Sequence, residues 1–279
     1  MNLYATLTDL RRYLGLGSAQ TQDDDLLLTL LGAASRLIDR HTGRRFYPAR
    51  RLRRYTVIDP AILPLRDDLL ELASLTNGDG RSIALEACHL HPPDGPVWSI
   101  IALDRTQVAF THTGDPVDAI AIDGIWGYHP DWPHAWTPSG DSVADDPLAA
   151  DATTLTVTDA SGVAGDGSAP RFAAGCLLRV EEEYLHVLAV DAETNTLTVA
   201  RGVNSTTAAS HPQGTAIAVY RLPADVRQGC LRVAAWLYKQ KDAGFVQSTG
   251  GLRGQITVPP ALPDDAAQIL APYVRVAVA

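Results

Sequence analysis

The sequence predicts an α+β protein, with helices at both ends of the chain and β strands between them. Apolar residues recur with helical spacing near both termini, and that spacing approaches two residues in the middle of the chain. Turn-forming residues separate the short middle segments. The chain has 279 residues, of which 46% are hydrophobic and 20% are charged, and this composition is typical of a globular protein.

The N-terminal part predicts two helices. Thr8 is expected to cap a short helix over residues 9–14. Thr21 and Asp24 stand at the spacing of a capping box before a longer helix, which Gly43 is expected to end. The apolar stripe that predicts this longer helix consists of Leu27, Leu30, Leu31, Ala34, Leu37 and Ile38.

The rest of the chain predicts two blocks of strands and then helices again. Strands of the first block are expected at residues 52–57, 69–76, 83–90, 100–103 and 119–125. Residues 127–150 contain four prolines and predict a loop, after which residues 151–221 predict a small inserted β module. A helix with Pro223 in its first turn and a short helix from Asp264 to about Ala271 follow. The predicted domains are therefore 1–150, 151–221 and 222–279.

The charge of the chain is unevenly distributed. A net charge of −9 and a pI near 5.3 exclude a protein that coats nucleic acid with its whole surface. Eight arginines nevertheless lie between residues 36 and 54, against the single acid Asp39. A solvated helix end and an edge strand would explain any individual arginine. Arginine suits fixed, bidentate contacts, so the cluster as a whole predicts a contact with an acidic partner surface or with phosphate. The residues chosen for that contact are Arg50, Arg51, Arg53 and Arg54.

The cysteines and the apolar runs predict a protein made in a reducing cytoplasm. Cys88, Cys176 and Cys230 are odd in number and have no metal-binding spacing, so neither a disulfide framework nor a zinc ribbon is expected. No apolar run reaches the roughly 18 residues of a membrane span. The first ten residues do not have the pattern of a secretory signal.

Histidines and clustered carboxylates are the candidate sites of chemistry in this sequence. His129, Asp131 and His134 could bind a metal, but the prolines between them favour a rigid aromatic loop. Carboxylates gather at residues 181–183 and 23–25, where strand alternation and the helix dipole predict structural roles. His211 has no nucleophile motif beside it, and no phosphate-binding glycine loop is present. The sequence thus predicts no catalytic, cofactor-binding or metal-binding residue, and a protein that is not an enzyme.

The order of these elements resembles that of the head–tail adaptor (connector) proteins of long-tailed bacteriophages. The matching segments are Leu7-Thr8-Asp9-Leu10, Tyr13-Leu14-Gly15, Asp24-Asp25-Leu26-Leu27, Thr42-Gly43-Arg44-Arg45-Phe46, Ser74-Leu75-Thr76-Asn77-Gly78-Asp79-Gly80 and Leu270-Ala271-Pro272-Tyr273-Val274-Arg275. The insert resembles a β module seen in phage virion proteins. Its matching residues are Gly175, Glu183, Val187, Leu197-Thr198-Val199, Arg201-Gly202, Thr206, Ala208, His211 and Gly214.

This resemblance implies a fold and a function. The fold would be a helical connector core, in which the long N-terminal helix packs with the C-terminal helices, with β strands and the inserted β domain added. The function would be that of a structural virion protein, which forms a dodecameric ring under the portal, connects capsid to tail and extends the DNA channel. It would be assembled in the host cytoplasm and reside in the virion neck, with no membrane contact.

The resemblance also implies the partners. They are the portal protein, the next neck protein (a stopper or tail terminator) and further copies of the chain, with double-stranded DNA only as passing cargo. A C-terminal arm over residues 246–279 is expected to embrace the portal. The apolar residues chosen for that contact are Ile256, Val258, Ile269, Leu270 and Tyr273.

Two other functions stay open at this point. Trp126, Tyr128, Trp132 and Trp136, together with the β insert, suggest a carbohydrate- or receptor-binding virion module. The paired carboxylates suggest a hydrolase, with less support.

Overall fold

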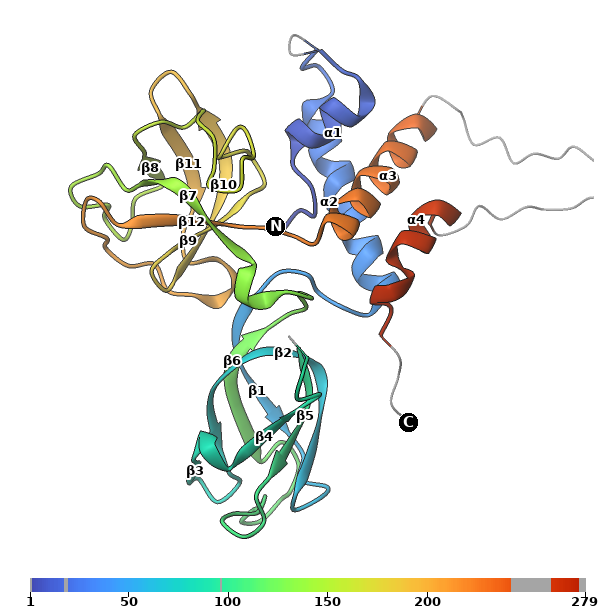
Figure 1. Ribbon diagram of the computed structural model, residues 1–279, viewed down its shortest axis with the longest axis vertical. Coiled ribbons are helices and arrows are strands. Elements are labelled where there is room, and N and C mark those ends of the chain that lie inside the picture. The colour runs from blue at the N-terminus through green and yellow to red at the C-terminus, as the bar shows by residue number, and fades with distance from the viewer. Residues whose placement is uncertain (1, 18–19, 96, 242–261, 276–279) are drawn as a thin grey trace, which may run out of the picture.

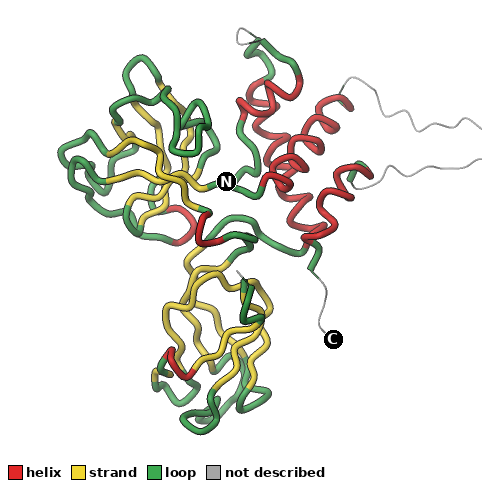
Figure 2. The backbone as a smooth tube through the Cα atoms, in the orientation of Figure 1, coloured by secondary structure: helices red, strands yellow, loops and turns green. Residues whose placement is uncertain are grey.

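The computed structural model describes residues 2–17, 20–95, 97–241 and 262–275, which form three bodies around a common junction (Figure 1). One body is helical and each of the other two is built on a β sheet, as the colouring of Figure 2 shows. Among the described residues, the helices are α1 (Leu7–Leu14), α2 (Asp24–Thr42), α3 (Ala224–Gln240) and α4 (Asp264–Leu270). They form the helical body, in which α2 packs on α3 and α3 packs on α4.

The first β lobe is a six-stranded antiparallel sheet. Its strands are β1 (Ala49–Tyr55), β2 (Ile62–Thr76), β3 (Ser82–Ile83), β4 (Cys88–His91), β5 (Trp98–Leu103) and β6 (Ile120–Trp126). Their order is β1-β6-β2-β5-β4, and β3 pairs with β2. The long strand β2 changes register against both neighbours, which bends the sheet around an apolar cluster of its own.

The second β lobe is also a six-stranded antiparallel sheet. Its strands are β7 (Trp136–Ser142), β8 (Thr154–Thr156), β9 (Leu177–Val180), β10 (Glu183–Asp191), β11 (Thr196–Ala200) and β12 (Ala216–Tyr220), in the order β7-β12-β9-β10-β11-β8. Strand β7 lies before residue 151, where the insert was expected to begin. The two ends of the lobe meet where the Arg221 N–H donates to the Ala135 carbonyl at 2.8 Å.

The expected fold class, a helical connector core with added strands, is wrong. The described chain is mostly β, with two complete six-stranded sheets and four helices. The reason is that the middle segments pair with one another in two sheets and do not merely add strands to a helical core. Each sheet thereby buries an apolar cluster of its own. The helices form one of three bodies instead of the core of the whole fold.

Two helix starts also differ from the prediction. Thr6, not Thr8, caps α1: its backbone is extended, its hydroxyl accepts from the Asp9 N–H, and the Asp9 carboxylate accepts in return from the Thr6 N–H. The expected capping box between Thr21 and Asp24 does not form, since α2 begins after Asp23 without a side-chain cap. The expected stop is confirmed, because Gly43 ends α2 with a φ of 65°.

A shared apolar cluster joins the helical body to the second β lobe. The buried stripe of α2 and the buried face of α3 belong to it, and so do Leu177, Tyr184 and Tyr220 of the second β lobe. The ring of Tyr220 lies 5.2 Å from the ring of Tyr47, and its hydroxyl donates to the Phe46 carbonyl at 2.8 Å. The second β lobe is therefore packed into the core of the subunit.

Candidate functional site

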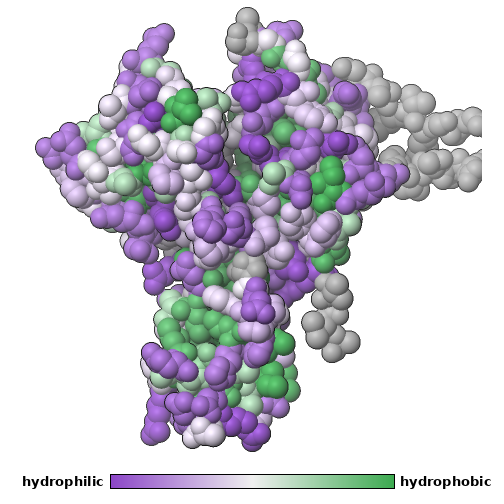
Figure 3. All heavy atoms as spheres, viewed as in Figure 1, coloured by the Kyte–Doolittle hydropathy of each residue, from purple (hydrophilic) through white to green (hydrophobic). Residues whose placement is uncertain are grey.

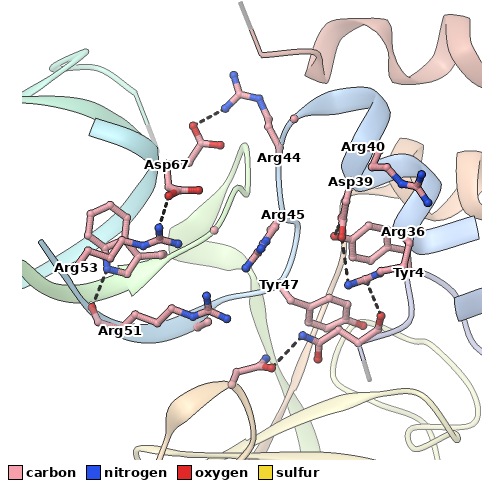
Figure 4. A pocket seen from close by; sticks show the side chains of 17 residues that line it. Tyr4, Arg36, Asp39, Arg40, Arg44, Arg45, Tyr47, Arg51, Arg53 and Asp67 are labelled. Carbon is pink, nitrogen blue, oxygen red and sulfur yellow. Dashed lines mark hydrogen bonds and ion pairs between the residues drawn. The ribbon is translucent and has the colours of Figure 1, made fainter. Parts of the chain in front are cut away.

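A concentration of arginine side chains surrounds a cavity at the junction of the three bodies. This arginine cleft has a volume of about 750 Å³ and lies between the C-terminal end of α2, the segment that follows it, and strands β1, β2 and β6 (Figure 4). The charged residues that line it are Arg36, Arg40, Arg44, Arg45, Arg51, Arg53, Asp39, Asp67 and Asp68.

Local structure explains how arginines that are spread along the sequence meet in one cleft. Arg36 and Arg40 are four residues apart on α2 and therefore share a face of the helix. Gly43 then turns the chain, with the left-handed backbone that ends the helix, and Arg44 and Arg45 follow this turn. The cleft thus receives arginines from a helix, from a turn and from a strand.

Strand β1 divides the four arginines predicted to bind a partner. Side chains alternate along a strand, so Arg51 and Arg53 line the cleft whereas Arg50 and Arg54 lie on the other face. Arg50 pairs with Asp123 of β6 at 3.3 Å, and Arg54 is exposed. The structure therefore brings two of the four together in the cleft.

Three of the cleft arginines are paired with the three acids of its walls. Arg36 pairs with Asp39 at 3.2 Å, Arg44 pairs with Asp68 at 2.6 Å, and Arg53 pairs with Asp67. Burial raises the pKa of Asp68 above its ordinary value, although the positive charge of Arg44 opposes the shift.

Asp39 is also fixed by a hydrogen bond, in addition to its ion pair with Arg36. The Tyr4 hydroxyl donates to its carboxylate, and the Phe46 N–H donates to the same hydroxyl at 3.0 Å. Burial again raises the pKa of Asp39, against the lowering effect of Tyr4 and Arg36. These contacts fix the C-terminal end of α2 to the N-terminal segment and hold one wall of the cleft.

The other three arginines have no such partner. Among the residues that the structure describes, the guanidinium groups of Arg40, Arg45 and Arg51 form no ion pair and no hydrogen bond. Burial lowers the pKa of Arg51, and the positive charges of Arg45 and Arg53 lower it further. The cleft is thus a site with unneutralised positive charge, which suits an anionic ligand.

The apolar residues predicted to bind a partner lie elsewhere. Leu270 and Tyr273 are buried in the shared apolar cluster of the subunit, and Ile269 is half-buried on α4. The rings of Tyr273 and Phe46 are 5.6 Å apart, so these residues pack within the subunit rather than on its surface. Ile256 and Val258 lie outside the described residues.

The cleft also contains residues that the sequence analysis did not choose as site residues. Arg36, Arg40, Arg44 and Arg45 were part of the noted arginine segment, and that density was the available signal. Nothing local to Asp67 or Asp68 indicated that β2 would meet the same arginines. Their placement depends on the pairing of β1 and β2 with β6.

The aromatic loop is part of the packed interior. His129 is buried; one ring nitrogen lies 2.9 Å from the Arg221 carbonyl, and the other accepts from the Asp131 N–H at 3.0 Å. Trp126 and Trp132 are buried as well. A carbohydrate-binding surface needs exposed rings, so this packing does not favour that alternative.

The candidate carboxylates are also accounted for by structure. Glu183 is buried in an ion pair with Arg201, and Asp23 binds Lys241 at 2.7 Å. Within the described ranges, no group of three or more His, Cys, Asp or Glu side chains is placed to hold a metal ion. In the same part of the chain, no helix has the length and apolar character needed to cross a membrane.

Comparison with protein-family models gives no match for this chain, and comparison with curated protein sequences gives none either, so its function is inferred from its own geometry.

Proposed function

We propose that this chain is a structural subunit of a bacteriophage neck. In this role it forms a dodecameric ring under the portal, connects capsid to tail and extends the DNA channel. The observation that carries the proposal is the closure of one helical body by helices from both ends of the chain (Figure 1). Helices α1 and α2 come from the first 42 residues, and α3 and α4 from the last 56.

The order of elements supports the same proposal. Between α2 and α3 the described chain forms the sheets of both β lobes, and the second lobe shares the apolar cluster of the helical body. This is the element order of the adaptor resemblance, with the intervening part enlarged into two sheets. A subunit of this form offers separate surfaces for a neighbour in the ring, for the portal and for the next neck protein.

Exposed apolar side chains support a role in assembly. Figure 3 shows apolar residues gathered on the first β lobe. Ile58 is 85% exposed, Leu52 61% and Val117 60%, and the lobe also exposes Ile62 and Leu85. Apolar side chains gathered on one face are typical of a protein–protein contact.

The charge of the chain supports a channel that DNA passes without being held. Tight binding to a duplex requires several arginines or lysines that neutralise phosphates, and the net charge of this chain is −9. The arginine cleft concentrates positive charge at one place, and we assign that place to a protein partner.

Negative-stain microscopy of the purified chain, alone and mixed with the portal ring of its virus, tests this proposal. Rings seated on the portal are expected. Ile58→Asp should reduce ring formation, because it places a charge in the apolar contact. Val163→Asp is the matched control, since Val163 is 55% exposed on the second β lobe. Single particles that never associate with each other or with the portal would contradict the proposal.

A further inference from the structure

The arginine cleft carries more positive charge than its own acids neutralise. Six arginines line it against three aspartates, and each aspartate already has an arginine partner. Three guanidinium groups, those of Arg40, Arg45 and Arg51, form no ion pair in the described part of the chain, although Asp39 attracts Arg45 and Asp67 attracts Arg51 at longer range. This excess is a property of the cleft itself and does not depend on the overall charge.

Two of these guanidinium groups face one another. In Figure 4, the side chains of Arg45 and Arg51 extend toward the same central space, while Arg40 lies farther out on α2. Burial lowers the pKa of Arg51, and the positive charge of Arg45 lowers it further, so the two like charges repel each other. An anion between the two groups would relieve this repulsion and accept hydrogen bonds from both.

The shape of the guanidinium group and the volume of the cleft indicate which class of ligand the cleft can bind. A guanidinium forks to donate two parallel hydrogen bonds to a carboxylate or to a phosphate. A volume of about 750 Å³ holds several side chains, whereas a duplex could reach only the rim. The cleft therefore suits a segment that enters it, not a rod that lies across it.

The walls of the cleft favour carboxylates over a nucleic acid. Asp39, Asp67 and Asp68 would repel a continuous row of phosphates, while a peptide can present its acids only where the free arginines lie. The aromatic residues of the lining, Tyr4, Tyr47 and Trp126, are buried and offer no exposed ring on which a base could stack.

We infer that the arginine cleft binds a carboxylate-rich peptide segment of a partner protein, with Arg45 and Arg51 as its central contacts and Arg40 at its edge. The inference rests on the proposed function for the identity of the partner, which would be another neck protein. The chemistry of binding requires only the isolated chain.

Fluorescence anisotropy with a labelled polyglutamate peptide tests this inference. The double variant Arg45→Gln/Arg51→Gln should bind the peptide at least about tenfold more weakly than the unchanged protein. The matched control is Arg81→Gln/Arg105→Gln, which removes the same charge from two exposed arginines outside the cleft and should bind like the unchanged protein. Thermal melts establish that both variants are folded, and Arg40→Gln alone should give a smaller loss.

Three results would overturn the inference. One is the absence of peptide binding by the unchanged protein, and another is an equal loss in both double variants, which would indicate a general charge effect. The third is displacement of the peptide by a short DNA duplex that binds more tightly, which would make the cleft a nucleic-acid site. If the chain binds the peptide but forms no ring, the inference about the cleft is supported and the proposed function is contradicted. If the chain forms rings but does not bind the peptide, the proposed function is supported and the inference about the cleft is contradicted.

Discussion

Glu183 and Arg201 form a bidentate ion pair inside the second β lobe, with both nitrogen–oxygen distances at 2.7 Å. The two side chains are 1% and 7% exposed. The same carboxylate also accepts from the backbone N–H groups of Gly202 and Ala209 at 2.9 and 3.1 Å. One ring nitrogen of His211 lies 2.8 Å from it. This network ties β10 to the segments before and after η3 (Val203–Ser205).

Glu183→Gln should destabilise the protein strongly. The change keeps the shape of the side chain but leaves Arg201 buried without a counter-charge, a loss that costs about 3–5 kcal/mol in buried pairs. Chemical denaturation measures the change in the free energy of unfolding. Glu182→Gln is the matched control, because Glu182 is exposed. A loss below about 1 kcal/mol for Glu183→Gln would mean that the pair behaves like one on the surface.

The same pair predicts how stability depends on pH. Burial alone raises the pKa of Glu183, but hydrogen bonds from Arg201, His211 and two backbone N–H groups outweigh burial and hold this pKa below its ordinary value. A carboxyl whose pKa is lowered by folding adds stability above its unfolded pKa, and this stability is lost as the pH falls through the folded pKa. Thermal melts in an acid series should therefore show the unchanged protein converging with Glu183→Gln. Parallel curves would argue against this assignment.

The two faces of β1 predict different effects for neighbouring arginines. Arg53 pairs with Asp67, and its guanidinium lies 4.9 Å from the centre of the Trp126 ring, whereas Arg54 is exposed on the opposite face. Arg53→Gln should lower the free energy of unfolding by about 1–2 kcal/mol. Arg54→Gln should change it by less than about 0.5 kcal/mol. Equal effects in denaturation would mean that the strand does not separate the two side chains.

Substitutions of Ile269 and Leu270, which are adjacent in α4, should also have different effects on the free energy of unfolding. Leu270 is fully buried against α3, where a methyl group added to Gly229 would lie 3.1 Å from its side chain. Leu270→Ala should cost about 2–5 kcal/mol of stability, because it leaves a cavity. Ile269 is half-buried, so Ile269→Ala should cost less. If Leu270→Ala were neutral for stability and abolished portal binding, Leu270 would act in the predicted partner contact and not in the packing of the subunit.

The cysteines should be reduced, with Cys230 the least reactive. Cys88, Cys176 and Cys230 are all free, and burial raises the pKa of Cys230 to about 12. Little of its thiolate therefore forms near neutral pH. Titration with a thiol reagent should label Cys88, which is half-buried, before Cys230. Intact mass without reductant should correspond to three free thiols, and a mass lower by the two hydrogens of one disulfide would contradict this.

Elements with strong local signals were predictable from the sequence. The apolar stripe of α2 and its stop at Gly43 are confirmed, as are α3 and α4 near their expected positions. These elements depend on residues three or four apart and on a single backbone conformation at the end of the helix. The start of α1 was misplaced by two residues because both Thr6 and Thr8 can cap a helix, and only the structure shows which one does.

Features that depend on distant pairing were not predictable. Pro138 helped to mark residues 127–150 as a loop, yet it lies in β7 and pairs with Ala218 of β12. Proline is tolerated there because β7 is an edge strand. The N–H group that proline lacks therefore leaves no carbonyl of a neighbouring strand without a donor. The cleft also depends on distant pairing. The arginines are visible in the sequence, but Asp67 and Asp68 come close to them only because of the strand register of the first β lobe.

The native mass of the purified chain, measured alone and after titration onto a bacteriophage portal ring, is the most direct test of the proposed neck ring. The 29.9 kDa chain is expected to add to the portal until a dodecameric ring of it is bound. Two separate masses, that of the portal alone and that of the single chain, at every mixing ratio and protein concentration would contradict the proposal.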